Sequence, residues 1–144
     1  MDEIELEVAR PPAVADVQAL LAGLVAYNRV HVEDRPEWAW EGLGVFARHS
    51  GSGRLVAGAD GHTGWSWLFV SHLWVTQDLR GGGVGRLVMG ELEEAARARG
   101  CTGAWLDTFS FQARGFYERI GYRQFGELTG FPPGHTRHFM AKRL

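Results

Sequence analysis

A strand, a glycine-rich loop, a helix and a second strand follow one another in the middle of this chain, and this order constrains its fold most. Trp65–Val75 is rich in aromatic and β-branched residues, which favours a long central strand. Val84–Arg99 carries its apolar residues on one helical face, and Gly100 ends it. Gly103–Thr108 is again strand-like. Because two strands joined through a crossover helix run parallel, the sequence predicts neighbouring parallel strands in one sheet.

Further strand-like and helix-like segments lie on both sides of this unit. Before it, the sequence predicts a short strand at Ile4–Val8, a helix that begins after Pro11-Pro12 and ends near Tyr27-Asn28, strands at Leu43–Arg48 and Arg54–Asp60, and a turn at Gly61–Gly64. After it, the sequence predicts a helix over Ala113–Ile120 that Ser110 caps, followed by strands at Tyr122–Glu127 and Thr136–Lys142. The stretch His31–Gly42 shows no clean period and predicts a short helix or a loop. The order predicts an α/β (α+β) fold, a mixed sheet flanked by helices, with residues 1–144 as a single domain.

Charge, hydropathy and cysteine content exclude several classes of protein. The 144 residues carry a formal net charge of −2 with histidine neutral, so no broad cationic field attracts nucleic acid. Neither a signal-like N-terminus nor an apolar stretch of about 18 residues occurs, so we expect no membrane segment. The single Cys101 has no partner for a disulfide or a zinc ribbon. We therefore predict a cytoplasmic protein that holds no metal.

The loop Arg80–Gly85 is the first candidate for chemistry. It precedes a helix, so several backbone N–H groups without helical partners point toward one place, and glycine lets the backbone approach an anion closely. Arg80 and Arg86 can add positive charge. The spacing matches neither a P-loop nor the dinucleotide Gly-x-Gly-x-x-Gly pattern, because Arg86 stands where the third glycine would fall. By itself the loop is equally well an ordinary flexible turn.

Two segments together resemble a known family. The stretch Val75–Leu87 is similar to the strand, loop and helix by which Gcn5-related N-acetyltransferases (GNAT enzymes) hold coenzyme A, and Arg80, Gly83 and Gly85 match its core pattern. The stretch Ser110–Tyr122 resembles the family's Asn-x-x-Ala-x-x-Phe-Tyr-Glu-Lys-x-Gly-Phe signature. The predicted order of elements also agrees with GNAT topology, so the resemblance covers most of the chain.

The resemblance implies an acetyl-CoA-dependent enzyme that moves an acetyl group to a primary amine by direct attack, with the parallel strands splayed apart. Tyr117 would be the general acid that protonates the leaving thiolate. The other residues that the resemblance assigns to the cofactor are Leu73 and Val75 for the pantetheine arm, Arg80, Gly81, Gly82, Gly83, Val84, Gly85 and Arg86 for the pyrophosphate, and Ser110, which stands where the family usually has Asn.

The general base and the acceptor contacts are less well marked. The unperturbed pKa of a histidine suits a general base, which makes His72 the candidate. Strand alternation, however, places His72 on the face opposite Ser71 and Val75 unless a bulge intervenes, and a bulge at this place is typical of the family that the chain resembles. A histidine bonded to a carbonyl is the structural alternative. Candidate acceptor contacts lie mostly in irregular segments, and several of them could as easily be solvated loop residues. They are Asn28, Glu33, Trp38, Trp40 and His135.

A second class of function stays open, which is a non-catalytic sensor or partner domain that binds coenzyme A. Such a domain would keep the glycine loop and lose the tyrosine that faces the sulfur, so Tyr117 favours an enzyme. The acceptor is a small molecule or a peptide amine, with polyamines, amino acids, aminoglycoside-like antibiotics and protein amines as candidates. A homodimer is also open, since dimers are the commonest closed assembly.

Overall fold

The computed structural model describes residues 3–144, and the chain divides into two compact units, one up to Arg35 and one from Pro36 to Leu144. The N-terminal unit contains the helix expected after the paired prolines, α1 (Val14–Asn28). Ile4–Val8 alternates like a strand but forms none, because a strand needs a hydrogen-bonded neighbour and no segment within residues 3–144 pairs with it. That strand prediction is therefore wrong. No helix within residues 3–144 is both long and apolar enough to span a bilayer.

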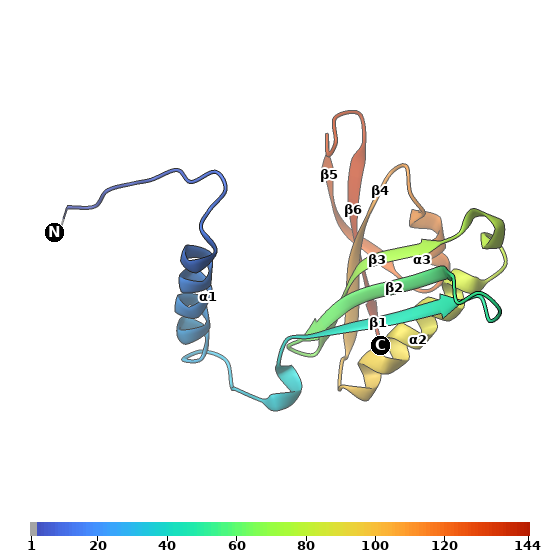
Figure 1. The fold of residues 1–144 in the computed structure, drawn as a ribbon, viewed down its shortest axis with the longest axis horizontal. Helices are drawn as coiled ribbons and strands as arrows, with labels where there is room; N and C mark the ends of the chain where they lie inside the picture. The colour runs from blue at the N-terminus through green and yellow to red at the C-terminus, as the bar shows by residue number, and fades with distance from the viewer. Residues whose placement is uncertain (1–2) are drawn as a thin grey trace. The chain divides into compact units, whose positions relative to one another are not determined.

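The second unit is built on a six-stranded sheet with the order β1-β2-β3-β4-β6-β5 (Figure 1). Its elements are η1 (Pro36–Trp38), β1 (Glu41–Arg48), β2 (Leu55–Gly64), β3 (Trp67–Val75), η2 (Gln77–Leu79), α2 (Val84–Ala98), β4 (Gly103–Phe109), α3 (Arg114–Arg119), β5 (Arg123–Thr129) and β6 (Thr136–Arg143). Only β3 and β4 pair in parallel, and the other neighbours are antiparallel. The predicted mixed sheet with flanking helices is confirmed.

The core lies between α2 and one face of the sheet. Figure 1 shows α2 along β1, β2 and β3, which it contacts in turn. Its buried residues Val88, Met89, Leu92 and Ala96 pack against small and aliphatic side chains of the strands, among them Ala57, Ala59, Leu68 and Val70. Cys101 belongs to this core, and burial raises the pKa of its thiol, which disfavours the reactive thiolate form.

The turn before β3 lies further along the chain than its glycines predict. Gly61 and Gly64 are inside β2, and the reversal is made by Trp65 and Ser66, both at positive φ. A Cβ on Gly61 would come within 1.9 Å of the carbonyl oxygen of Phe69 on β3. A Cβ on Gly64 would meet the Trp40 ring at 2.3 Å. These glycines therefore make room for close neighbours, and the predicted turn at residues 61–64 is wrong.

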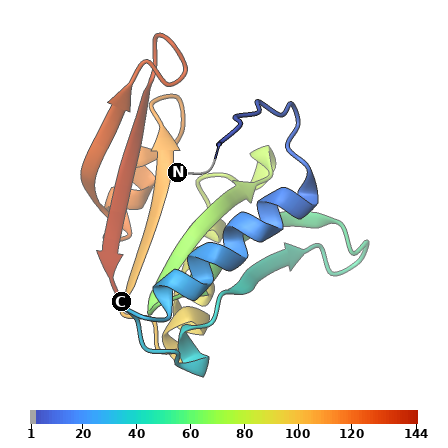
Figure 2. The same ribbon diagram turned by 90° about the vertical axis from the view of Figure 1, so that its left-hand side faces the viewer.

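The parallel strands β3 and β4 pair over only part of their length. Trp67, Leu68 and Phe69 pair with Gly103, Ala104 and Trp105, and no β4 residue pairs with β3 beyond that point. Figure 2 shows the two strands side by side at one end and diverging toward the other. The predicted parallel, splayed pair is confirmed, and the splay leaves one edge of β3 unpaired from Val70 to Val75.

Ser110 does not cap α3, whose N-cap is Ala113. The Ser110 hydroxyl instead accepts a hydrogen bond from the Thr136 N–H at 3.1 Å and lies 3.2 Å from Nδ1 of His135. The side-chain carbonyl of Gln112 accepts the Phe109 N–H at 2.9 Å. Because β6 returns beside the end of β4, Ser110 joins these strands, and the predicted capping role is wrong.

A buried polar network fastens α2 to β6. Glu93 is only 4% exposed, and its carboxylate accepts hydrogen bonds from the Tyr122 hydroxyl at 3.1 Å and from Nζ of Lys142 at 2.8 Å. Burial, and after it the charge of Glu93, raises the pKa of Tyr122, so the hydroxyl remains a donor. Each member of the network has a partner.

We expect Glu93→Ala to lower the free energy of unfolding by about 2–4 kcal/mol, because it leaves a buried hydroxyl and an ammonium group without partners. Urea denaturation measures this loss. Glu94→Ala is the matched control, since Glu94 is exposed and forms a surface ion pair with Arg97 one turn away, and we expect a change within about 0.5 kcal/mol. Equal losses in the two variants would show that the network does not stabilise the fold.

Candidate active site

The glycine loop between β3 and α2 has an open, exposed backbone at the start of a helix. Gly81 and Gly83 have φ of +78° and +87°, which L side chains rarely adopt, and a Cβ on either would have nothing within 4 Å. In the described part of the chain, no N–H from Gly81 through Arg86 donates to a backbone carbonyl, and the first helical bond runs from Leu87 to Gly83. Unpaired amides at the positive end of a helix attract an anion such as a diphosphate.

The two arginines beside the loop are tied to neighbouring elements. Nε of Arg80 donates to the carbonyl of Val75 at 3.1 Å, across the base of the loop. Nη2 of Arg86 donates to the carbonyl of Arg119 at 3.3 Å, at the end of α3. These single bonds leave guanidinium N–H groups that can reach an anion, and they fix where the positive charge lies.

A bulge interrupts β3 at Ser71. Asp60 pairs with His72 and Gly61 pairs with Val70, so Ser71 has no partner on β2. Leu73 and Val75 lie on the face that packs on the core. The bulge expected in this strand is present, yet His72 still lies on the face opposite Val75, within the stretch of β3 that has no β4 partner.

Tyr117 lies on α3, close to the start of α2. The preceding residue, Phe116, has its ring about 3.4 Å from the position of a Cβ on Gly85, which brings α3 against the loop. Burial first, and the nearby charge of Asp107 second, raises the pKa of Tyr117 to about 12. The phenol is therefore protonated at neutral pH and is a hydrogen-bond donor.

The candidate acceptor contacts are distributed over both units. Asn28 and Glu33 belong to the N-terminal unit, where Glu33 pairs with Arg35 at 2.9 Å. Trp38, Trp40 and His135 belong to the second unit. There the Trp40 ring meets His62 edge-on and Trp65 at a tilt, and the ring of His135 meets Phe111 edge-on. Trp40 and His135 thus lie in different aromatic clusters. The roles of all five residues stay predictions.

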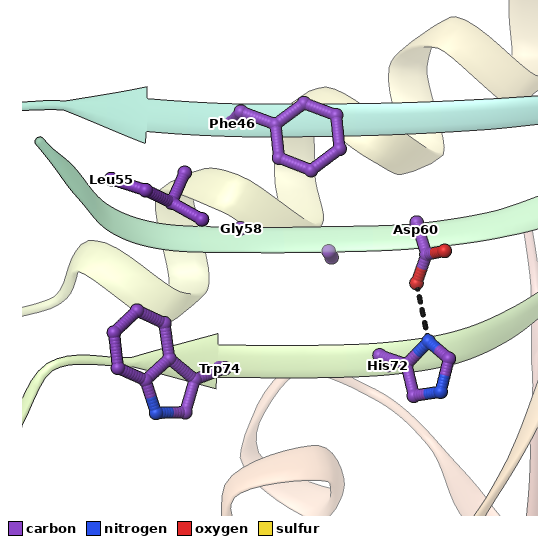
Figure 3. A pocket seen from close by; sticks show the side chains of 7 residues that line it. Phe46, Leu55, Gly58, Asp60, His72 and Trp74 are labelled. Carbon is purple, nitrogen blue, oxygen red and sulfur yellow. Dashed lines mark hydrogen bonds and ion pairs between the residues drawn. The ribbon is translucent and has the colours of Figure 1, made fainter. Parts of the chain in front are cut away.

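Asp60 is the residue that sequence reasoning missed. Its Oδ1 lies 2.8 Å from Nδ1 of His72 (Figure 3). No motif marks this aspartate, because its partner is twelve residues away across a hairpin whose turn the glycine pattern misplaces. A correct register for β2 and β3 would have paired the two residues.

Known proteins similar to this chain are acetyltransferases. Residues 14–122 match the family model described as the acetyltransferase (GNAT) family. A blasticidin-S acetyltransferase of Streptomyces morookaense is 43% identical over 93 residues, which cover 64% of this chain and 68% of that one. An acetyltransferase of Agrobacterium fabrum is 34% identical over 134 residues, covering 91% and 95%. A crystal structure of a Bacillus cereus acetyltransferase superposes with a TM-score of 0.87 at 29% identity, covering 99% and 98%.

The fold, with its splayed parallel strands beside a glycine-rich helix start, is that of an acyltransferase, and the similar proteins agree. The chain belongs to the GNAT family of acetyltransferases.

Proposed function

We propose that this protein transfers the acetyl group of acetyl-CoA to a primary amine of a small molecule. The observation that carries the proposal is the placement of an unpaired strand edge, residues 70–75 of β3, next to a loop of unpaired amides at the start of α2. An extended, amide-containing arm that ends in a diphosphate is complementary to such a surface, because the arm can pair with the strand edge while the amides bind its phosphates.

Each part of the site has a role in the proposal. Backbone N–H groups from Arg80 to Arg86 bind the diphosphate, and the edge at Leu73 and Val75 binds the pantetheine arm. Acetyl-CoA supplies the acetyl group as an activated thioester. The Tyr117 hydroxyl donates to the leaving sulfur, and His72 accepts the proton of the amine. Ser110 already bonds Thr136, so we assign it at most a minor contact with the cofactor.

For the acceptor we favour a small-molecule antibiotic with a primary amine over a peptide. The support is the 43% identity to a protein named for acetylation of blasticidin S. Within the second unit, Trp40 is 61% exposed and its neighbours His62 and Trp65 extend the aromatic surface. Such a surface suits a planar or amphipathic acceptor.

A panel of amines tests the proposal. The protein is incubated with acetyl-CoA and, in separate reactions, blasticidin S, an aminoglycoside, a polyamine, single amino acids and a lysine peptide, and thiol release and product mass are followed. We expect amine-dependent thiol release, fastest with a small-molecule antibiotic. If calorimetry shows tight acetyl-CoA binding but no amine in the panel is acetylated, a binding protein without this activity replaces the proposal.

A further inference from the structure

Asp60 and His72 face each other directly across β2 and β3, on the face of the sheet opposite α2. They are register partners, and the distance between Oδ1 of Asp60 and Nδ1 of His72 is 2.8 Å (Figure 3). The bulge at Ser71 comes immediately before His72, and the unpaired edge of β3 continues through it. The pair therefore lies where β3 leaves β4.

The contact determines how the imidazole ring is protonated. An ionised carboxylate only accepts hydrogen bonds, so the neutral ring must carry its proton on Nδ1 to bond Asp60. The other nitrogen, Nε2, is then left with a lone pair. Without Asp60 the ring could turn and could hold its proton on either nitrogen.

The pair forms the polar end of an otherwise apolar hollow of about 160 Å³ (Figure 3). Phe46, Leu55 and Trp74 line its other end. Gly44 and Gly58 let the Phe46 ring lie against the strands, since a Cβ on either would come within about 3.0 Å of that ring. An amine attached to an apolar group fits this arrangement, with its nitrogen at the carboxylate and imidazole.

We propose that Asp60 is the positioning residue of the transfer reaction, holding His72 with Nε2 toward the acceptor so that the ring takes the proton of its ammonium group. This proposal rests on the proposed function. One proton passes from the ammonium to Nε2, the ring becomes a cation that stays bonded to the Asp60 carboxylate, and the amine attacks the thioester carbonyl with the lone pair it keeps. The C–S bond then breaks, and the second proton of the nitrogen replaces the one that Tyr117 gives to the departing sulfur, so coenzyme A leaves as the thiol. The ring later returns the proton to water.

An ordinary exposed ion pair is the competing explanation, and it makes different predictions. Such pairs contribute little to stability and nothing to turnover. If Asp60 acts through His72, Asp60→Asn and His72→Gln should each lower kcat by about 10²-fold and change the KM for acetyl-CoA by less than about twofold. The double variant should be no slower than His72→Gln alone, because two residues that act as a unit are not additive. Asp60→Glu should recover part of the rate.

The decisive readout needs neither acetyl-CoA nor acceptor. Long-range ¹H–¹⁵N NMR of the histidine rings, with His72 assigned from the His72→Gln spectrum, should show the proton on Nδ1 in the wild type and a mixture of tautomers in Asp60→Asn. Glu127→Gln is the control for removing a carboxylate beside a histidine elsewhere in the sheet, because Glu127 is the register partner of His138 across β5 and β6, with Nδ1 and Oε2 3.5 Å apart. It should change neither kcat nor the His72 signals.

An unchanged tautomer or an unchanged kcat in Asp60→Asn overturns the positioning role while the proposed function stands. A wild-type protein that acetylates no amine overturns both. A shifted tautomer together with a selective loss of kcat supports the proposal.

Discussion

A Gly83→Val protein should fold and bind acetyl-CoA at least about 10²-fold more weakly than the wild type. Gly83 has φ of +87° in open space, so valine adds backbone strain of about 1–2 kcal/mol without a clash inside the protein. The branched side chain then projects where the diphosphate would meet the amides. Losing one or two charge-assisted hydrogen bonds, each of about 1.5–3 kcal/mol, corresponds to this loss of affinity. Calorimetric titration with acetyl-CoA measures it.

The Gly100→Val variant is the control that separates the effect of backbone strain from the loss of acetyl-CoA binding. Gly100 ends the same helix, has φ of +86° and also has nothing within 4 Å of a Cβ. Both variants should lose similar stability in urea denaturation, and only Gly83→Val should lose acetyl-CoA affinity. Equal affinities in the two variants would remove the loop from the cofactor site.

Tyr117→Phe should lower kcat by about 10²-fold and leave acetyl-CoA affinity nearly unchanged, because the ring still packs while the hydroxyl is lost. With its pKa raised to about 12, the phenol is a much weaker acid than a thiol, whose ordinary pKa is about 8.5. The hydroxyl therefore stabilises the leaving sulfur mainly as a hydrogen-bond donor. For this reason we expect the loss of kcat to lie in the lower part of the range that is usual when a general acid is removed. The same pKa keeps Tyr117 protonated from pH 7 to about 10, so its ionisation should not reduce kcat there.

Single-turnover kinetics with a confirmed acceptor measure the chemical step. Tyr122→Phe is the control, because Tyr122 is buried and bonds Glu93, so we expect it to lose stability and keep kcat. A Tyr117→Phe protein within about tenfold of wild-type kcat would make Tyr117 a packing residue.

Several features were predictable because short-range chemistry decides them. The periodic apolar face of α2, its start after Gly83 and its end shortly before Gly100 depend on residues within and next to one helix. The parallel relation of β3 and β4 follows from the crossover helix between them. The loop's open amides are likewise a local property of consecutive glycines at a helix start.

Other features depend on residues far apart in the chain. By its local sequence Gly61 is a turn residue, but the structure places the Phe69 backbone against it on the neighbouring strand. By its local sequence Ser110 is a helix cap, but its hydroxyl accepts a hydrogen bond from the Thr136 N–H instead. Ile4–Val8 has the alternation of a strand, but alternation cannot supply the neighbour that a strand needs.

The sequence by itself determined the family, the central strand–loop–helix–strand unit and the residues that could hold a diphosphate, because these depend on spacing along the chain. Only the tertiary structure decided which side chains meet. The bulge at Ser71 and the register of β2 with β3 bring Asp60 to His72, and a shift of one residue would turn the aspartate to the opposite face of the sheet. Register is set by packing across the whole sheet, and for that reason no local pattern around Asp60 could reveal its partner.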